Sequence, residues 1–124
     1  MKQVLATEQA PAAIGPYSQG IAAGETVYVS GQLPLDPATG AFPDGIAAQT
    51  AQSLKNIQAI LAQQGMTLAN VVKTTVFLAD INDFAEMNKV YGEFFTQPYP
   101  ARSAVQVAKL PKDAPLEIEC IAVK

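Results

Sequence analysis

The chain has 124 residues, of which 49% are hydrophobic and 15% charged, and its formal net charge is −3. This length and composition predict one globular domain over residues 1–124 that is poor in charge for a free-standing monomer. The absence of histidine excludes Ser-His-Asp and Cys-His catalysis, histidine-ligated metals and two-histidine ribonuclease chemistry. A single cysteine, Cys120, excludes an internal disulfide and a cysteine zinc cluster. Seven lysines and one arginine against eleven acids leave no basic surface that could follow a nucleic-acid backbone.

The first residues do not have the pattern of an export signal. Lys2–Leu5 is followed by a polar stretch that contains proline, and no apolar run reaches the length of a membrane span. A lone cysteine also suits a reducing compartment. We therefore expect a cytoplasmic protein.

The first half of the chain predicts two short strands followed by a helix. Residues 20–30 have the pattern of two strands around the turn Ala23–Glu25, and Thr26–Ser30 is the stronger of the two. After Gly45, apolar residues return at the 3.6-residue spacing of an amphipathic helix, which Gly65 would end. The inward positions of that helix are Ile46, Thr50, Leu54, Ile57 and Leu61.

The second half predicts a strand, a helix and two further strands. Val71–Leu78 is β-branched and aromatic, as is typical of a strand. Asp83–Glu86 is a capping-box candidate that would open a helix, which Pro98 would stop. The apolar positions of this helix are Phe84, Met87, Val90, Tyr91, Phe94 and Phe95. With strands at Ser103–Val107 and Leu116–Val123, the order predicts an α+β fold, a two-layer sandwich of a β-sheet with two helices on one face.

The strands of this sheet are apolar on both sides. In the strand after residue 70, Val72, Val76 and Leu78 are expected on one face, and Val71 and Phe77 on the other. Two helices cover only one face, so the second would be an exposed apolar patch. We therefore expect a homo-oligomer in which a partner subunit covers that face.

Arg102, Glu117 and Glu119 are the strongest candidates for chemistry. Arg102 is the only arginine and follows Pro100, so its guanidinium would be held rigidly enough to bind a carboxylate or phosphate at two points; a surface or ion-paired arginine is an equally good interpretation. Glu117 and Glu119 share the face assigned to the oligomer interface, where a buried carboxylate needs a partner such as Arg102. The contact would be either a structural pair or a site in which a carboxylate activates water.

Five other residues allow a functional or a structural interpretation. Tyr17 lies in a turn that would display its ring at a surface or cleft, although a core tyrosine is the more common outcome. Ser30 and Gly31 end a strand, where bare N–H groups would suit an anion, or where glycine simply makes a turn. Lys73 would suit a Schiff base, but a lysine that extends its ammonium group towards solvent is the simpler interpretation. Cys120 is predicted to be a small core residue and not a nucleophile.

Several motifs together resemble one known family, the RidA (YjgF) reactive-intermediate deaminases, and the likeness covers the whole chain. The motifs are Ala10–Gly20, Val29–Pro34, Val72–Phe77, Asn82–Phe84 with Asn88, Pro100–Ser103 and Leu116–Glu119. The resemblance implies a homotrimer with a chorismate-mutase-like fold and three clefts, each between two subunits. It also implies hydrolysis of 2-imino acids, or their enamine tautomers, to 2-keto acids and ammonia, with no metal or organic cofactor. Pyridoxal-phosphate dehydratases that act on serine or threonine release such intermediates.

The resemblance also assigns roles to single residues. Arg102 matches the arginine that binds the substrate carboxylate, Glu117 matches the acid associated with the hydrolytic water, and Tyr17 matches an aromatic residue of the cleft. Other residues that line the family's site are matched by Ser30, Gly31 and Asn88. This chain departs from well-studied members at Ala104, where they often have cysteine, and over Phe95–Pro100, which is shorter and alters the rim of the cleft.

Two other functions are compatible with these residues. One is a sensing module that binds small carboxylates such as 2-keto acids in the same cleft without turnover. The other is an RNA-acting translation inhibitor, an activity that has been described for relatives of the family. The acidic balance, the single arginine and the lack of histidine weigh against the second.

Overall fold

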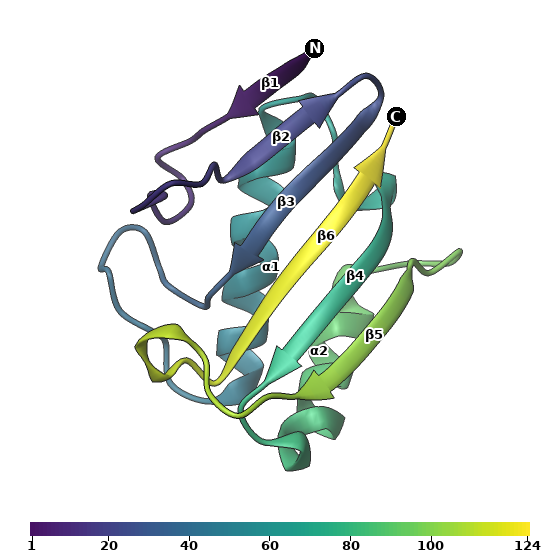
Figure 1. The fold of residues 1–124 in the computed structure, drawn as a ribbon. Helices are drawn as coiled ribbons and strands as arrows, with labels where there is room; N and C mark the ends of the chain where they lie inside the picture. Colours follow the sequence, from purple (N-terminus) through teal and green to yellow (C-terminus); the bar gives the residue numbers. More distant parts are fainter.

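Six strands form one mixed sheet in the computed structural model, which describes residues 1–124 (Figure 1). The strands are β1 (Lys2–Leu5), β2 (Gly20–Ala23), β3 (Thr26–Gln32), β4 (Val71–Leu78), β5 (Ala101–Gln106) and β6 (Leu116–Val123). They lie in the order β1-β2-β3-β6-β4-β5, and only the β4–β5 pair is parallel. The predicted α+β fold is confirmed. The sequence pattern did not predict β1, and β5 begins at Ala101, so Arg102 lies inside the strand and not before it.

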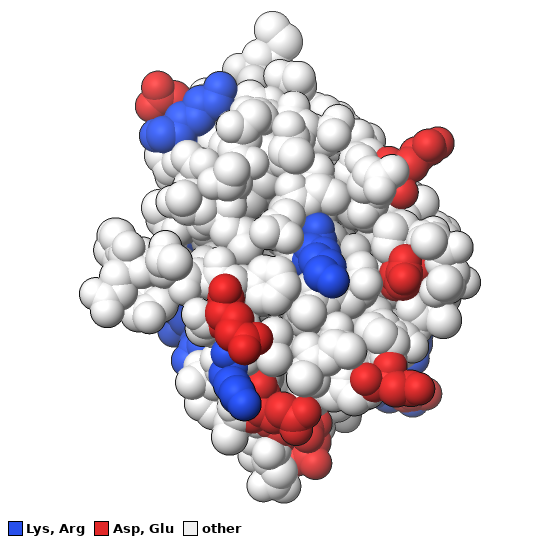
Figure 2. Space-filling model, turned by 180° about the vertical axis from the view of Figure 1, so that it is seen from behind, with Lys and Arg blue, Asp and Glu red and all other residues white.

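Both helices, α1 (Ile46–Ala62) and α2 (Phe84–Phe94), lie on one face of the sheet, as the order of elements predicts (Figure 1). Helix α2 connects β4 to β5, which is the crossover that two parallel strands require. Figure 2 views the molecule from the helix side and shows acidic and basic side chains scattered over it. Neither helix combines the length and the apolar character that crossing a membrane requires.

The two helices differ in how well their ends were predicted. Gly65 has φ of 68°, the left-handed conformation that ends α1 as expected. The predicted capping box at Asp83 is wrong, because the Asp83 side chain caps no backbone N–H group. Instead, the Asp80 carboxylate accepts a hydrogen bond of 2.9 Å from the Asn82 N–H and caps a short 3-10 turn that leads into α2.

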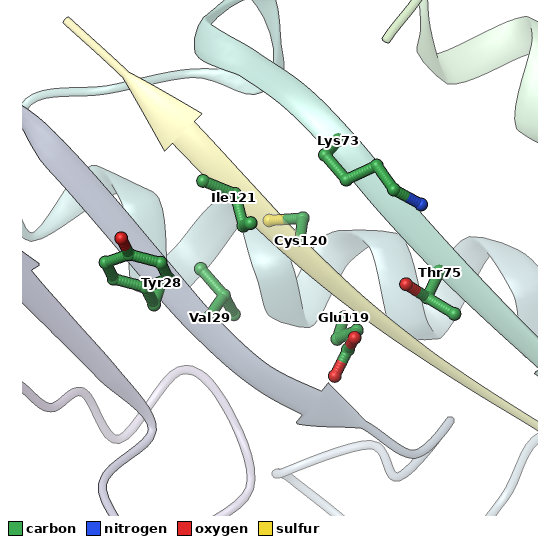
Figure 3. A pocket seen from close by; sticks show the side chains of 7 residues that line it. All are labelled: Tyr28, Val29, Lys73, Thr75, Glu119, Cys120 and Ile121. Carbon is green, nitrogen blue, oxygen red and sulfur yellow. The ribbon is translucent and has the colours of Figure 1, made fainter. Parts of the chain in front are cut away.

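The second face of the sheet is uncovered, as predicted, and carries apolar residues. Tyr28 of β3 is 50% exposed and Val105 of β5 is 44% exposed. A hollow of about 310 Å³ lies on this face between β3, β6 and β4 (Figure 3). It is lined by Tyr28, Val29, Lys73, Thr75, Glu119, Cys120 and Ile121. We refer to this uncovered surface as the open face.

A bulge in β4 overturns one part of the expected pattern. Val71 pairs with Ala122 and Lys73 pairs with Ile121, so Val72 is an additional residue in β4. The extra residue reverses the alternation of side chains before it. The predicted faces of Val71 and Val72 are therefore wrong: Val71 is buried under the helices, whereas Val72 is 48% exposed.

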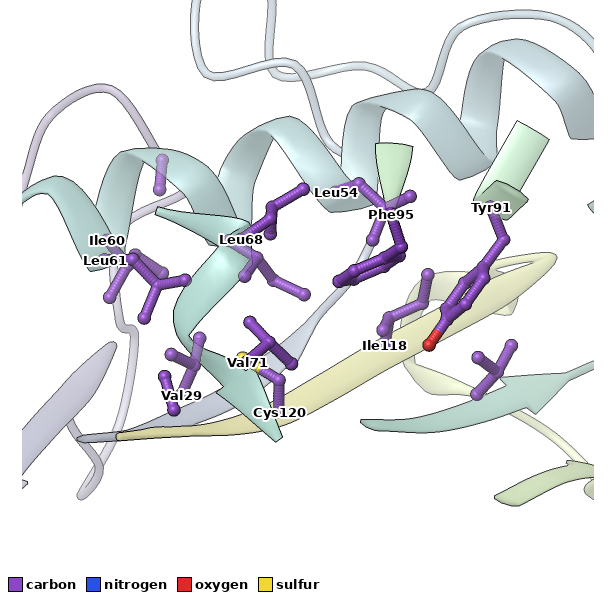
Figure 4. Close-up of a cluster of buried hydrophobic side chains, with 14 of the residues drawn as sticks. Val29, Leu54, Ile60, Leu61, Leu68, Val71, Tyr91, Phe95, Ile118 and Cys120 are labelled. Carbon is purple, nitrogen blue, oxygen red and sulfur yellow. The ribbon is translucent and has the colours of Figure 1, made fainter. Parts of the chain in front are cut away.

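The core lies between the helices and the sheet (Figure 4). The predicted inward residues Leu54, Ile57 and Leu61 of α1 are fully buried there. They pack with side chains of the central strands, such as Ile118 of β6. Removing this apolar surface from water holds the helices on the sheet, and the ends of β3 and β6 are thereby fixed in place.

Candidate active site

A cleft of about 1110 Å³ is formed by segments that are distant in the sequence. One wall is the loop between β1 and β2, and another is the end of β3 with the loop that follows it. The remaining side comes from the 3-10 turn Pro111–Asp113 and the start of β6. Four of the predicted site residues line the cleft, namely Tyr17, Ser30, Gly31 and Glu117.

The wall between β1 and β2 is held by the side-chain amide of Gln19, which is buried. Its oxygen accepts a hydrogen bond of 2.7 Å from the Thr7 N–H, and its nitrogen donates to the carbonyl groups of Thr7, Ala10 and Pro11. Tyr17 lies on the same loop, two residues before Gln19, and is 54% exposed at the cleft. The expectation of a displayed aromatic ring is confirmed, and the alternative of a core tyrosine is excluded.

Ser30 joins this wall to the sheet. Its hydroxyl donates a hydrogen bond of 2.5 Å to the Ser18 carbonyl, and its N–H donates to the Gln19 carbonyl at 2.9 Å. Both donors of Ser30 are therefore used within the chain. The Ser30 hydroxyl can therefore accept a hydrogen bond from a ligand but has no free donor for one.

Ser30 and Gly31 form a bulge in β3. Val29 pairs with Cys120 and Gln32 pairs with Ile118, so two residues of β3 face one residue of β6. The bulge brings Gly31 against Glu117: a Cβ atom added to Gly31 would lie 2.6 Å from Cδ of the Glu117 carboxyl group. The position of Glu117 therefore depends on the missing side chain of Gly31.

We expect Gly31→Ala to lower the rate of any reaction that uses Glu117 by about 10²-fold, because a misplacement of about 1 Å has that effect on a catalytic group. The rate is compared with that of Gly92→Ala, since a Cβ atom on Gly92 of α2 meets nothing within 4 Å. Thermal unfolding of both variants shows whether they fold. A folded Gly31→Ala protein with the unchanged rate would contradict this role.

The carboxyl group of Glu117 is half-buried and receives no hydrogen bond within the chain. Burial raises its pKa above the ordinary value, and the neighbouring Glu119 carboxylate raises it further. A carboxylate whose proton affinity is increased in this way is better suited to take a proton from water.

The other two predicted site residues, Arg102 and Asn88, lie together but do not line the cleft. Arg102 of β5 stands beside Thr74 of β4, which is fully buried beneath the helices. Its Nη1 donates a hydrogen bond of 2.7 Å to Oδ1 of Asn88 on α2. Glu117 points to the open face, so the expected contact between Arg102 and Glu117 is not made within one chain. The only ion pair of the chain joins Lys109 and Asp113.

Cys120 is the core residue that the sequence predicts, whereas the ammonium group of Lys73 is held against the sheet and does not extend freely into solvent. Cys120 is 4% exposed, and burial raises the pKa of its thiol to about 12, so it is a core residue and not a nucleophile. Lys73 points to the open face (Figure 3). Its Nζ donates to the Thr74 carbonyl at 2.9 Å and to the Ser103 hydroxyl at 3.2 Å.

Two aromatic residues beside Arg102 were not predicted to have a role at the site. The guanidinium carbon of Arg102 lies 4.7 Å from the ring centroid of Tyr91 and 5.4 Å from that of Phe84. The sequence pattern assigned both rings to the apolar stripe of α2. The available signal was their spacing, because Phe84, Asn88 and Tyr91 stand at positions i, i+4 and i+7 of one helix face.

Comparisons with known proteins cover the whole length of the chain. The family profile described as Endoribonuclease L-PSP matches residues 7–124. The 2-iminobutanoate/2-iminopropanoate deaminase of Salmonella typhimurium is 53% identical over 127 residues, which cover 100% of this chain and 99% of the relative. The protein of the same name in Escherichia coli K12 is 52% identical with the same coverage.

Solved structures of similar proteins have nearly the same fold. RidA from an Antarctic Psychrobacter species has a TM-score of 0.95 at 48% identity, with 98% of this chain and 99% of the other covered. TdcF of E. coli with bound serine has a TM-score of 0.94 at 48% identity, with 98% of each chain covered. The similarity in sequence and the similarity in structure to these proteins thus extend over the same residues.

Proposed function

Because this chain belongs to the Endoribonuclease L-PSP family, which includes the RidA and YjgF proteins, we propose that it hydrolyses reactive 2-imino acids, or their enamine tautomers, to 2-keto acids and ammonia. The observation that carries the proposal is the identity of 53% over the full chain to a 2-iminobutanoate/2-iminopropanoate deaminase. We place the reaction in the cytoplasm, where a free thiol such as that of Cys120 stays reduced.

The reaction needs a held substrate, a placed water molecule and a carrier for protons. The C=N carbon of a 2-imino acid is already electrophilic, above all when the nitrogen is protonated, so no strong nucleophile is required. Arg102 binds the carboxylate through two parallel N–H donors, and backbone groups near Gly31 orient the imine end. Glu117 takes a proton from water while the oxygen adds to the carbon, which forms a carbinolamine. Glu117 returns that proton to the nitrogen, and the C–N bond breaks as the Glu117 carboxylate takes the proton of the new hydroxyl group. The products are the 2-keto acid and ammonia, which leaves with this last proton as ammonium.

We propose that the complete site forms between copies of the chain in a homotrimer. Within one chain, Glu117 points to the open face while Arg102 lies at the opposite face of the sheet beside α2. The exposed apolar residues of the open face provide the surface on which a neighbouring copy packs. Arg102 and Asn88 of one copy then meet Tyr17, Gly31 and Glu117 of the next around one small carboxylic acid.

The proposal is tested by generating 2-iminobutanoate in situ from threonine with a pyridoxal-phosphate dehydratase. We expect 2-oxobutanoate and ammonia to appear faster when the wild-type protein is added, and we expect Arg102→Ala to remove the acceleration. A wild-type protein that binds 2-oxobutanoate but accelerates nothing would be a sensor of carboxylates and would overturn the enzymatic proposal.

The comparisons do not favour the alternative of an RNA-acting protein, although the family description names an endoribonuclease. The chain has no histidine and a net charge of −3. Its basic side chains are scattered among acidic ones on the helix side (Figure 2). A surface of this kind has weak attraction for a phosphate backbone.

A further inference from the structure

The guanidinium group of Arg102 is supported by one face of helix α2. Phe84, Asn88 and Tyr91 stand at i, i+4 and i+7, which places their side chains in a row along the helix. Asn88 accepts a hydrogen bond of 2.7 Å from Nη1, while the guanidinium carbon lies 4.7 Å from the Tyr91 ring and 5.4 Å from the Phe84 ring. Both distances are within the range of a cation–π interaction.

The Tyr91 ring is itself fixed on two sides. Its hydroxyl shares a buried hydrogen bond of 2.7 Å with Oγ1 of Thr74, the residue beside Arg102 in the parallel β4–β5 register. Its ring packs against that of Phe95 with a centroid separation of 4.5 Å. Burial raises the pKa of Tyr91, so the phenol stays protonated and does not form an ion pair with Arg102. The contact is therefore made by the face of the ring.

We propose that Tyr91 and Phe84 are positioning residues that hold the Arg102 guanidinium in the orientation in which it binds the substrate carboxylate. The inference rests on the proposed function, since it assigns how the carboxylate-binding group of that site is oriented. A free arginine side chain samples many rotamers and loses that freedom when it binds. Two rings and one amide hold the guanidinium group before the substrate arrives, so its conformational entropy is lost on folding and not on binding. The N–H donors that do not contact Asn88 stay available for the carboxylate.

This role acts on binding and not on the chemical step. The carboxylate keeps its charge throughout imine hydrolysis, so its contact with Arg102 is equally strong in the ground state and the transition state. Loss of the rings is therefore expected to raise KM and the Kd for the product, with kcat nearly unchanged. A purely structural role of the same rings would lower the stability without this selective effect.

The test compares Tyr91→Leu, Tyr91→Phe and Phe84→Leu in the full-length protein, with 2-oxobutanoate as the binding probe. We expect Tyr91→Leu to raise the Kd by about tenfold and Phe84→Leu by about threefold, in line with partly exposed cation–π contacts. Tyr91→Phe keeps the ring and loses only the hydroxyl, so it should raise the Kd much less than Tyr91→Leu. Phe84 is only partly buried, which makes its variant the one best able to fold.

Phe95→Leu is the matched control, because Phe95 packs on Tyr91 in the same core but is not one of the two rings in cation–π contact with Arg102. It should lower the melting temperature and raise the Kd much less than Tyr91→Leu does, because the Tyr91 ring and its hydrogen bond to Thr74 remain. Unchanged Kd values in folded Phe84→Leu and Tyr91→Leu, while Arg102→Ala abolishes binding, would overturn the positioning role alone. Unchanged binding in Arg102→Ala would instead overturn the carboxylate contact on which the proposed function depends.

Discussion

Replacing Arg102 by lysine is expected to lower kcat/KM for 2-iminobutanoate by about 10²-fold, because two charge-assisted hydrogen bonds become one and each is worth about 1.5–3 kcal/mol. Lysine keeps the positive charge but lacks the planar pair of donors that matches a carboxylate. It also loses the flat group that lies over the Tyr91 ring. The measurement is the rate of 2-oxobutanoate release in the dehydratase-coupled assay.

Arg102→Ala extends this prediction, since it removes the charge as well and should be less active than Arg102→Lys. Sedimentation of both variants checks that the oligomer is intact. If Arg102→Lys is as active as the wild type while the oligomer is unchanged, charge alone is sufficient, and the two-point contact with the substrate is wrong.

Replacing Glu117 by glutamine is expected to lower kcat by about 10²- to 10⁴-fold, the usual contribution of a positioned general base. KM should change little, because the amide has nearly the same shape and the carboxylate of the substrate is bound elsewhere. In the wild type, activity should fall as the pH drops through the raised pKa of Glu117, since protonation removes the base. This acid limb lies at higher pH than it would for an unperturbed carboxyl group.

Glu119→Gln provides the control for that pH profile. The charge of Glu119 is one of the two causes that raise the pKa of Glu117, so its removal should move the acid limb towards lower pH. The wild type and both variants are compared by kcat as a function of pH. A larger effect of Glu117→Gln on KM than on kcat would make Glu117 a binding or interface residue.

The two classes of inactive variant also test where the site forms. If each cleft takes Arg102 from one copy and Glu117 from the next, a mixture of Arg102→Ala and Glu117→Gln chains contains clefts with both residues intact. Random assembly from equal amounts makes about one quarter of the clefts complete. Recovery of activity after joint refolding, but not after simple mixing of stable oligomers, is the expected result; no recovery after refolding would place the site within one chain.

Most of the fold could be predicted because its elements have strong local patterns. Residues 71–78 and 116–123 are strands at the predicted bounds, and the spacing of α1 identified its buried side. The faces of Val71 and Val72 could not be predicted, because a bulge depends on pairing with β6 and leaves no local mark. Strand β1 was missed for a related reason: its four residues are mostly exposed and are ordered by pairing with β2 alone.

The candidate site likewise has a part that the sequence predicted and a part that it did not. Tyr17, Ser30, Gly31 and Glu117 were named from motifs, and the structure brings them to one cleft. That Arg102 would lie over two aromatic rings was not predicted, because apolar residues at helical spacing usually belong to a core. Tyr91 has two roles, because it is buried in the core and also contacts Arg102. Only the position of β5 beside α2 distinguishes the two interpretations.

The attachment of the loop that carries Tyr17 has a consequence for how molecules enter and leave. Every hydrogen bond that joins residues 7–17 to another segment passes through the single side chain of Gln19. Losing those few bonds leaves the loop held mainly by the packing of Ala10 in the core, while all strand ladders remain paired. Such local opening requires less free energy than global unfolding. We therefore expect this wall of the cleft to open locally, without any disturbance of the scaffold that orients the reacting groups.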